Sequence, residues 1–217
     1  MILSRNHRFV FIKGHKVAGT SIELALSAVC GPDDILTPLP PVDERQRSYG
    51  ARNYSERREL EAAYRQAVQT ADIDPPRTVF YNHMPLREVE ALVPLDGYRV
   101  IVAERSPYAK IMSHLGMKGF VPEQFADALD TVPLDAVRNI DLYRDATGSL
   151  RTDTVIRYQT LEHDVAALGL GPLVLPHAKR GLMSDTLDPR AHFRRDQLDR
   201  INEHYAEEFE AFGYARM

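Results

Sequence analysis

The sequence contains one cysteine, Cys30, and a slight excess of acidic over basic residues. A single cysteine in 217 residues excludes an intrachain disulfide framework and a zinc site built from several cysteines. The chain has 27 Lys and Arg against 31 Asp and Glu, so its formal net charge is −4. This balance argues against binding to bulk nucleic acid. Any basic site must therefore be a local pocket in an acidic chain.

Long apolar runs are also missing. No run approaches the ~20 residues that a membrane-spanning helix needs, and no charged-then-apolar signal segment opens the chain. We therefore expect a protein without a transmembrane segment that works in the cytoplasm. A length of 217 residues suits one domain with a substantial core, so we expect residues 1–217 to form a single domain.

The first informative segment follows a short apolar run at residues 9–12. A loop with two glycines and Lys16 comes next, and apolar residues then recur at helical spacing. This pattern predicts a buried strand, a tight loop and a helix whose N-terminus faces the loop. Backbone amides and the positive end of the helix dipole then meet at one point, which suits a phosphate or sulfate. Lys16 adds a full charge, and Thr20 and Ser21 add hydroxyl groups.

This loop differs from the Walker A loop, in which a lysine directly follows the second glycine. Gly14 and Gly19 have the Walker spacing, but Thr20 stands where that lysine belongs, and the lysine lies inside the loop at Lys16. The pattern disfavours an ordinary Mg²⁺-dependent nucleoside triphosphate hydrolase. For this segment alone, a strand–helix turn with a solvated lysine remains an alternative.

A second apolar run, at residues 98–103, predicts another strand that is covered on both faces, as in a parallel sheet. Arg105 follows this run. Pro107 suits the first turn of a helix, where no amide hydrogen is needed, and Ser113 lies one to two turns further on. An arginine fork and a hydroxyl are good partners for a terminal phosphate. A surface arginine and an ordinary helix serine are the alternative.

Together the two segments resemble the sulfotransferases that use 3′-phosphoadenosine 5′-phosphosulfate (PAPS), above all the carbohydrate-type branch and its bacterial relatives. Residues 105–113 match the family motif R-[DN]-P-Y-x-[RK]-x-x-S, which binds the 3′-phosphate, with Ser106 in place of the usual Asp or Asn. Residues 156–161 are similar to the family's late strand, with Gln159 in place of an acid. The motif K-[TV]-[AG]-G-T-S, which cradles the 5′-phosphosulfate, is matched by Lys16, Val17, Ala18, Gly19, Thr20 and Ser21.

The resemblance implies an enzyme that transfers the sulfuryl group of PAPS to a hydroxyl acceptor by in-line displacement, without a metal. It implies that Lys16 stabilises charge on the bridging and phosphate oxygens, and that Arg105 and Ser113 hold the 3′-phosphate. Lys179 and Arg180, in a late basic loop, are further candidates for phosphate contacts, with a solvated basic turn as the alternative. The acceptor would be a saccharide, a glycolipid or a small natural product, and the enzyme would be cytoplasmic and bacterial.

His83 is our candidate for the general base. It follows a predicted third strand at residues 78–81, and imidazole titrates near neutral pH. Several carbohydrate-type members place a histidine in a similar H-x-P context. A structural histidine is the alternative reading, and we expect at most a binding role for His15. Competing bases are Glu88, Glu104 and the acids of residues 43–61.

Strands that alternate with helices predict an α/β fold: a single-domain, P-loop-like, doubly wound parallel sheet flanked by helices, with ligands beyond the carboxyl ends of the strands. Further predicted elements are an irregular connection at residues 31–54, a surface helix at 55–72, a fourth strand at 154–157 and a long amphipathic helix at 195–212.

Two rival functions remain open at this point. A nucleotide kinase-like phosphotransferase should place an acidic Mg²⁺ ligand after a strand, for which Glu104 and Asn82 are poor candidates. A non-catalytic nucleotide-binding protein of the same fold would keep the anion site without the chemistry. Acceptor specificity should lie in residues 31–60 and 114–150, which carry no readable code.

Overall fold

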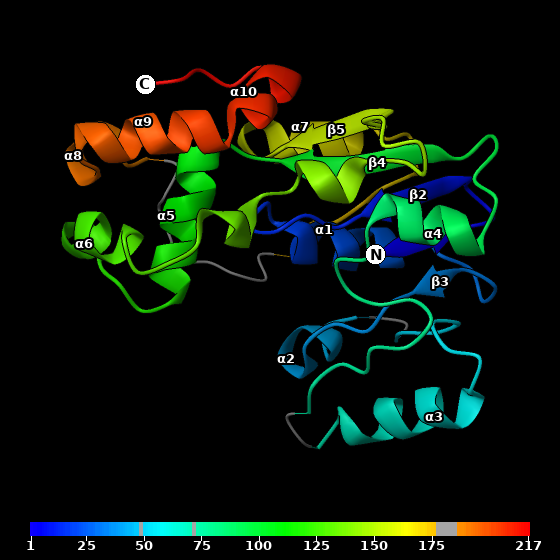
Figure 1. Cartoon of the computed structure of the whole chain (residues 1–217). Coiled ribbons are helices and arrows are strands. Elements are labelled where there is room, and N and C mark those ends of the chain that lie inside the picture. Colours follow the sequence, from blue (N-terminus) through cyan, green and yellow to red (C-terminus); the bar gives the residue numbers. More distant parts are fainter. Residues whose placement is uncertain (48–49, 71–72, 177–185) are drawn as a thin grey trace.

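The computed structural model describes residues 1–47, 50–70, 73–176 and 186–217. Within them the strands form one mixed sheet of order β3-β1-β2-β4-β5 (Figure 1). The strands are β1 (Ile2–Ser4), β2 (Phe9–Ile12), β3 (Ile35–Leu36), β4 (Arg99–Glu104) and β5 (Thr154–Arg157). β2, β4 and β5 run parallel, whereas β1 is antiparallel to both β2 and β3.

The sequence prediction of an α/β fold is confirmed, but that of a wholly parallel sheet is wrong. β1 pairs with β2 as an antiparallel neighbour, with Ile2 opposite Phe11. The connection between these strands is a short turn in which Arg8 takes a positive φ of 53°. A connection this short can join only antiparallel strands, because a parallel pair needs a long crossover. The three-residue apolar run before the turn carried no strand signal of its own.

Alternate residues of the parallel strands enter two separate hydrophobic clusters. Val10 and Val102 pack with residues of α4 (Leu86–Leu92) on one face. Phe11 and Ile101 pack with residues of α1 (Gly19–Ser27) and α7 (Leu161–Ala166) on the other. Because both faces are covered, these strands read as continuous apolar runs rather than as alternating patterns.

The remaining helices lie at the ends of the sheet. Figure 1 shows α5, α6, α8 and α9 gathered at one end, and α2 and α3 below β3. A third hydrophobic cluster joins α5, α6 and α9. These helices are α2 (Pro41–Glu44), α3 (Arg58–Ala67), α5 (Pro107–Met117), α6 (Phe125–Leu129), α8 (Pro189–His192), α9 (Arg195–His204) and α10 (Ala206–Phe212). Short 3₁₀ turns are η1 (Pro122–Gln124), η2 (Leu134–Val137), η3 (Ile140–Tyr143) and η4 (Tyr158–Thr160).

The predicted third strand at residues 78–81 is wrong. Among the residues that the structure describes, this segment has no ladder partner. It runs beside Tyr54, whose carbonyl accepts from the Phe80 amide at 3.0 Å and from the Thr78 hydroxyl at 2.7 Å. Phe80 is buried in the same cluster as Val10, so the apolar pattern reports burial and not strand pairing. The residue type of an apolar run cannot distinguish the two cases.

The other predicted strand and helices are present in the structure. The strand at 154–157 is confirmed as β5, and the surface helix at 55–72 is found as the shorter α3. The helix at 195–212 is divided into α9 and α10 at Tyr205, which takes φ −102° and ψ 19° and donates from its buried hydroxyl to the Leu134 carbonyl. The irregular connection at 31–54 contains β3 and α2. Among the described residues, no helix has the length and apolar character to cross a membrane.

Candidate functional site

The loop between β2 and α1 has an unusual backbone path. Lys16 and Ala18 take positive φ values of 59° and 60°, the left-handed region that residues with a side chain adopt rarely. Left-handed residues in alternation let successive backbone amides converge on one anion. Such backbone strain persists only where the surrounding structure enforces it, and it gathers at ligand sites.

The first turn of α1 completes this loop. Ala18 is the N-cap residue of α1 and offers no capping side chain, and no acidic residue lies in the first turn. The first amides of a helix have no intrahelical partner, so the amides of Gly19, Thr20 and Ser21 suit an anion. Thr20 is buried and Ser21 is partly exposed.

Of the two loop lysines, only Lys16 lies at the loop surface. Lys13 is buried and forms an ion pair with Glu23 of α1, with its Nζ 3.0 Å from Glu23 Oε2. Lys16 is partly exposed and its Nζ donates to Met117 Sδ at 3.3 Å. Met117 ends α5, so the loop faces this helix.

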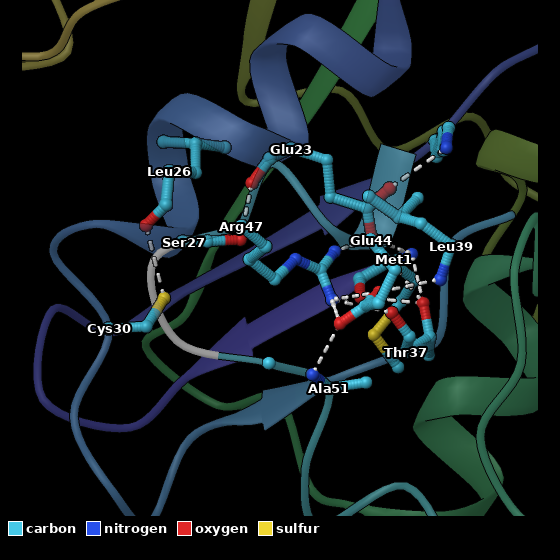
Figure 2. Close-up of polar contacts among 12 residues, drawn as sticks. Met1, Glu23, Leu26, Ser27, Cys30, Thr37, Leu39, Glu44, Arg47 and Ala51 are labelled. Atoms are coloured by element: carbon cyan, nitrogen blue, oxygen red, sulfur yellow. Dashed lines mark hydrogen bonds and ion pairs between the residues drawn. The ribbon is translucent and has the colours of Figure 1, made fainter. Parts of the chain in front are cut away.

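Several basic groups surround the buried carboxylate of Glu23 behind the loop. Its Oε1 accepts from the Met1 amine at 2.9 Å and lies 3.4 Å from Arg47 Nη2 (Figure 2). Burial alone would raise the pKa of Glu23, but Lys13, the Met1 amine and Arg47 hold that pKa well below its usual range. Glu23 is therefore an anion that fixes α1 and the start of the loop.

Arg105 meets the first loop, as the sequence predicts for two motifs that follow neighbouring parallel strands. β2 and β4 pair in register, with Ile12 beside Val102, so both strands end at the same edge of the sheet. Arg105 is buried, and its Nη1 lies 3.5 Å from the Lys16 carbonyl oxygen. Its guanidinium stacks 4.0 Å above the ring centre of Tyr158, which fixes the plane of the fork.

Ser113 lies on the side of α5 that faces the loop. The helix begins at Pro107, as predicted, and Ser113 stands one turn before Met117. Residues four apart share one face of a helix, so the contact between Met117 and Lys16 places Ser113 toward the same region. Ser113 is buried, at 6% exposure.

His83 also reaches this edge, although the strand expected before it is missing. Its Nδ1 lies 2.9 Å from the Lys13 carbonyl oxygen, and its ring stacks on that of His15. Burial, together with the neighbouring charges of His15 and Lys13, lowers the pKa of His83 to about 2. The imidazole is therefore neutral at physiological pH. The Lys13 carbonyl oxygen can only accept a hydrogen bond, so Nδ1 of His83 carries the proton. Nε2 then keeps a free lone pair.

The two main competitors for the role of base are engaged elsewhere. Glu88 accepts from the Tyr81 hydroxyl. Glu104 is completely buried and accepts from Lys110 Nζ at 2.8 Å and from Asn139 Nδ2 at 2.7 Å. A carboxylate in this position cannot reach an acceptor hydroxyl, and the same burial makes it unsuitable as a Mg²⁺ ligand.

Two predicted contacts cannot be placed. Lys179 and Arg180 lie outside the described residues. Two residues that sequence reasoning missed do contact the site: Tyr158 lies beneath Arg105, and Asn139 binds the loop backbone. Tyr158 stands in the segment 156–161 that resembles the family's late strand, but sequence reasoning assigned it no contact with Arg105. Asn139 stands in no motif, and the fold brings it to the site from a distant part of the chain.

Two hollows beside α3 hold none of the residues predicted to bind the donor and do not include His83. They are lined in part by Glu44 and Glu61, two of the acids of residues 43–61 that are competing candidates for the base. Their volumes are about 250 and 270 Å³, and both have basic linings that include Arg65. They lack the convergence of loop amides, a helix N-terminus and Arg105 that distinguishes the β2–α1 loop. We therefore place the candidate site at this loop.

A scan against family models finds no match for this chain, and searches for similar curated proteins and solved structures find none either. What the site does is therefore inferred from its residues and their arrangement.

Proposed function

We propose that this protein is a single-domain, P-loop-like sulfotransferase that moves the sulfuryl group of PAPS to a hydroxyl acceptor. One observation supports this most: the Arg105 guanidinium lies 3.5 Å from the Lys16 carbonyl oxygen. Two anion-binding segments, 89 positions apart in the chain, thus share one edge of the sheet. The donor needs such a pair, because it carries a 5′-phosphosulfate and a separate 3′-phosphate.

The donor's two anionic ends are assigned to different groups. The amides of residues 17–21 and the Lys16 ammonium hold the 5′-phosphosulfate. Arg105 and Ser113 hold the 3′-phosphate, which distinguishes this donor from ATP. Stacking on Tyr158 fixes the Arg105 fork before the ligand arrives, so little side-chain entropy is lost on binding.

The transfer is an in-line displacement. The acceptor oxygen attacks sulfur while the bond from sulfur to the 5′-phosphate oxygen breaks, and 3′-phosphoadenosine 5′-phosphate leaves. Nε2 of His83 accepts the proton that the hydroxyl loses. Lys16 stabilises the charge that grows on the bridging oxygen, so positioning and electrostatic stabilisation provide most of the rate. The mechanism requires no metal ion.

The low pKa of His83 is compatible with this role. The free site keeps the imidazole neutral, the form that accepts a proton. A donor with several negative charges close to the ring favours the imidazolium, so binding raises the pKa of His83 toward a value useful for catalysis. The acceptor remains a saccharide, a glycolipid or a small natural product.

Calorimetric titration tests the proposal. We expect 3′-phosphoadenosine 5′-phosphate to bind without Mg²⁺, and Arg105→Ala to abolish that binding. Arg200→Ala is the matched control, because Arg200 is half-exposed and pairs with Asp130 on the surface. A preference for Mg²⁺-ATP would overturn the proposal in favour of a kinase-like phosphotransferase. Binding with no transfer to any acceptor would identify a non-catalytic nucleotide-binding protein.

A further inference from the structure

Asn139 contacts the loop through both ends of its side-chain amide. Its Oδ1 accepts from the His15 amide at 2.7 Å, and its Nδ2 donates to the His15 carbonyl oxygen at 3.1 Å. The two residues are 124 positions apart, and Asn139 is completely buried. One side chain thus fixes both backbone polar groups of His15, immediately before the left-handed Lys16.

The orientation of this amide is set by His15 and Glu104. Asn139 Nδ2 donates to Glu104 Oε1 at 2.7 Å, and the other carboxylate oxygen accepts from Lys110 Nζ at 2.8 Å. The His15 N–H can only donate, so the oxygen end of the Asn139 amide must meet it. The nitrogen end then points toward Glu104 Oε1.

The backbone of Asn139 is fixed as well. Its amide donates to Glu208 Oε1 at 2.5 Å, and Glu208 Oε2 accepts from Lys110 Nζ at 2.6 Å. Asn139, Glu104, Lys110 and Glu208 therefore form a closed, buried ring of hydrogen bonds. The ring links the loop to β4, α5 and α10, so Asn139 has little freedom to move away from His15.

The loop also packs directly on this side chain. A Cβ added to Gly14 would lie 2.8 Å from Asn139 Nδ2 and would overlap the Tyr143 hydroxyl. The absence of a side chain at Gly14 is what allows the backbone to approach Asn139 closely enough for both hydrogen bonds.

We propose that Asn139 is a positioning residue for the donor loop. It holds the backbone N–H and C=O of His15, and this keeps the amides of residues 17–21 directed at the 5′-phosphosulfate. The His15 amide is used by Asn139, so it does not bind the ligand. This inference rests on the proposed function for the identity of the anion, but the hydrogen bonds that fix the loop do not depend on it.

The test compares two variants and two ligands. Asn139→Ala removes both bonds to His15. Tyr143→Phe is the matched control, because the Tyr143 hydroxyl donates to the Ala103 carbonyl oxygen and to Glu104, one member of the buried ring, and among the described residues makes no hydrogen bond to the loop. The ligands are 3′-phosphoadenosine 5′-phosphate and adenosine 3′-phosphate, which lacks the group that the loop binds.

We expect Asn139→Ala to raise the Kd for 3′-phosphoadenosine 5′-phosphate about tenfold or more, the effect of losing hydrogen bonds that position the loop. Its Kd for adenosine 3′-phosphate should stay close to the wild-type value. Tyr143→Phe should leave the Kd for both ligands unchanged. Equal weakening for both ligands, or no weakening in a folded Asn139→Ala protein, would overturn the proposal.

Hydrogen exchange in the wild type gives a second readout that needs no variant. Without ligand, the His15 amide should exchange as slowly as the amides of β2, whereas the Val17 amide should exchange fast and become protected by 3′-phosphoadenosine 5′-phosphate. Fast exchange at His15 would overturn the role of Asn139 even if Asn139→Ala does not fold. If the His15 amide exchanges slowly but the protein binds neither ligand, the role of Asn139 in fixing the loop is supported. The sulfotransferase proposal is then overturned.

Discussion

The imidazole rings of His15 and His83 stack face to face, with ring centres 4.1 Å apart and planes 11° from parallel. His15 belongs to the β2–α1 loop, and His83 lies in a turn where it takes a positive φ of 59°. The pair connects the proposed base to the loop that would hold the sulfuryl donor. Burial lowers the pKa of His15 as well, with Lys110 and Lys13 adding to the effect. The lowered pKa of each ring favours its neutral form, which reduces the repulsion that two stacked imidazolium ions would feel.

His83→Gln should lower the rate of sulfuryl transfer at least about hundredfold, because a general base contributes a factor of this order. Binding of 3′-phosphoadenosine 5′-phosphate should be nearly unchanged. Single-turnover kinetics and calorimetry measure the two effects separately. His163→Gln is the control, since the His163 side chain is 83% exposed. A wild-type rate in His83→Gln would mean that another group takes the proton.

The stability of the protein should fall in acid. The pKa of a histidine is usually 6.5, and the pKa of His83 in the folded protein is about 2. Between these pH values the unfolded chain therefore binds more protons than the folded protein does. The free energy of unfolding then falls as pH decreases below 6.5, by at most about 1.4 kcal/mol per pH unit for this group. Urea unfolding at several pH values measures the slope. His83→Gln should make it shallower, and an identical slope would exclude His83 as its source.

Gly19→Ala should destabilise the protein by about 1–3 kcal/mol, as expected for overpacking a filled site. A Cβ at Gly19 would lie 2.7 Å from Lys13 Cγ, and Lys13 is held by its ion pair with Glu23. At Gly31 a Cβ would meet nothing within 4 Å, so Gly31→Ala is the matched control and should be close to neutral. Urea unfolding compares the two variants, and equal stabilities would contradict the packing described at the loop.

Glu23→Gln should cost about 3–5 kcal/mol of unfolding free energy, because it removes the buried carboxylate that pairs with Lys13 and leaves Arg47 with Glu44 as its ion-pair partner. One carboxylate oxygen faces the Met1 amine and Arg47 (Figure 2). The other oxygen faces Lys13. Glu59→Gln removes an exposed pair with Arg57 and should change stability by less than about 0.5 kcal/mol. Denaturant midpoints of the two variants check the difference. A loss as small as that of Glu59→Gln would show that solvent replaces the missing charge.

The sequence predicted β2 and β4 from their continuous apolar runs, because a strand buried on two faces must be largely apolar. β5 was predicted as well, although only Ile156 of that strand is buried. It also predicted the start of α5 at Pro107, since proline fits only the first turn of a helix. It failed at residues 78–81, where an apolar run packs into the core without a strand partner. It also failed at Tyr205, where packing of the buried ring divides a helix that carries no proline or glycine.

For the site, the sequence by itself determined which residues are proposed to bind an anion: a loop with Lys16, a helix start without a cap, and Arg105 after a buried strand. These follow from residue type and local order. Only the tertiary structure decided that Arg105 reaches the Lys16 carbonyl, that Tyr158 lies beneath it, and that Asn139 holds His15 across 124 positions of the chain. Local patterns report burial and backbone preference, whereas contacts of this kind depend on which distant segments the sheet and its helices bring together.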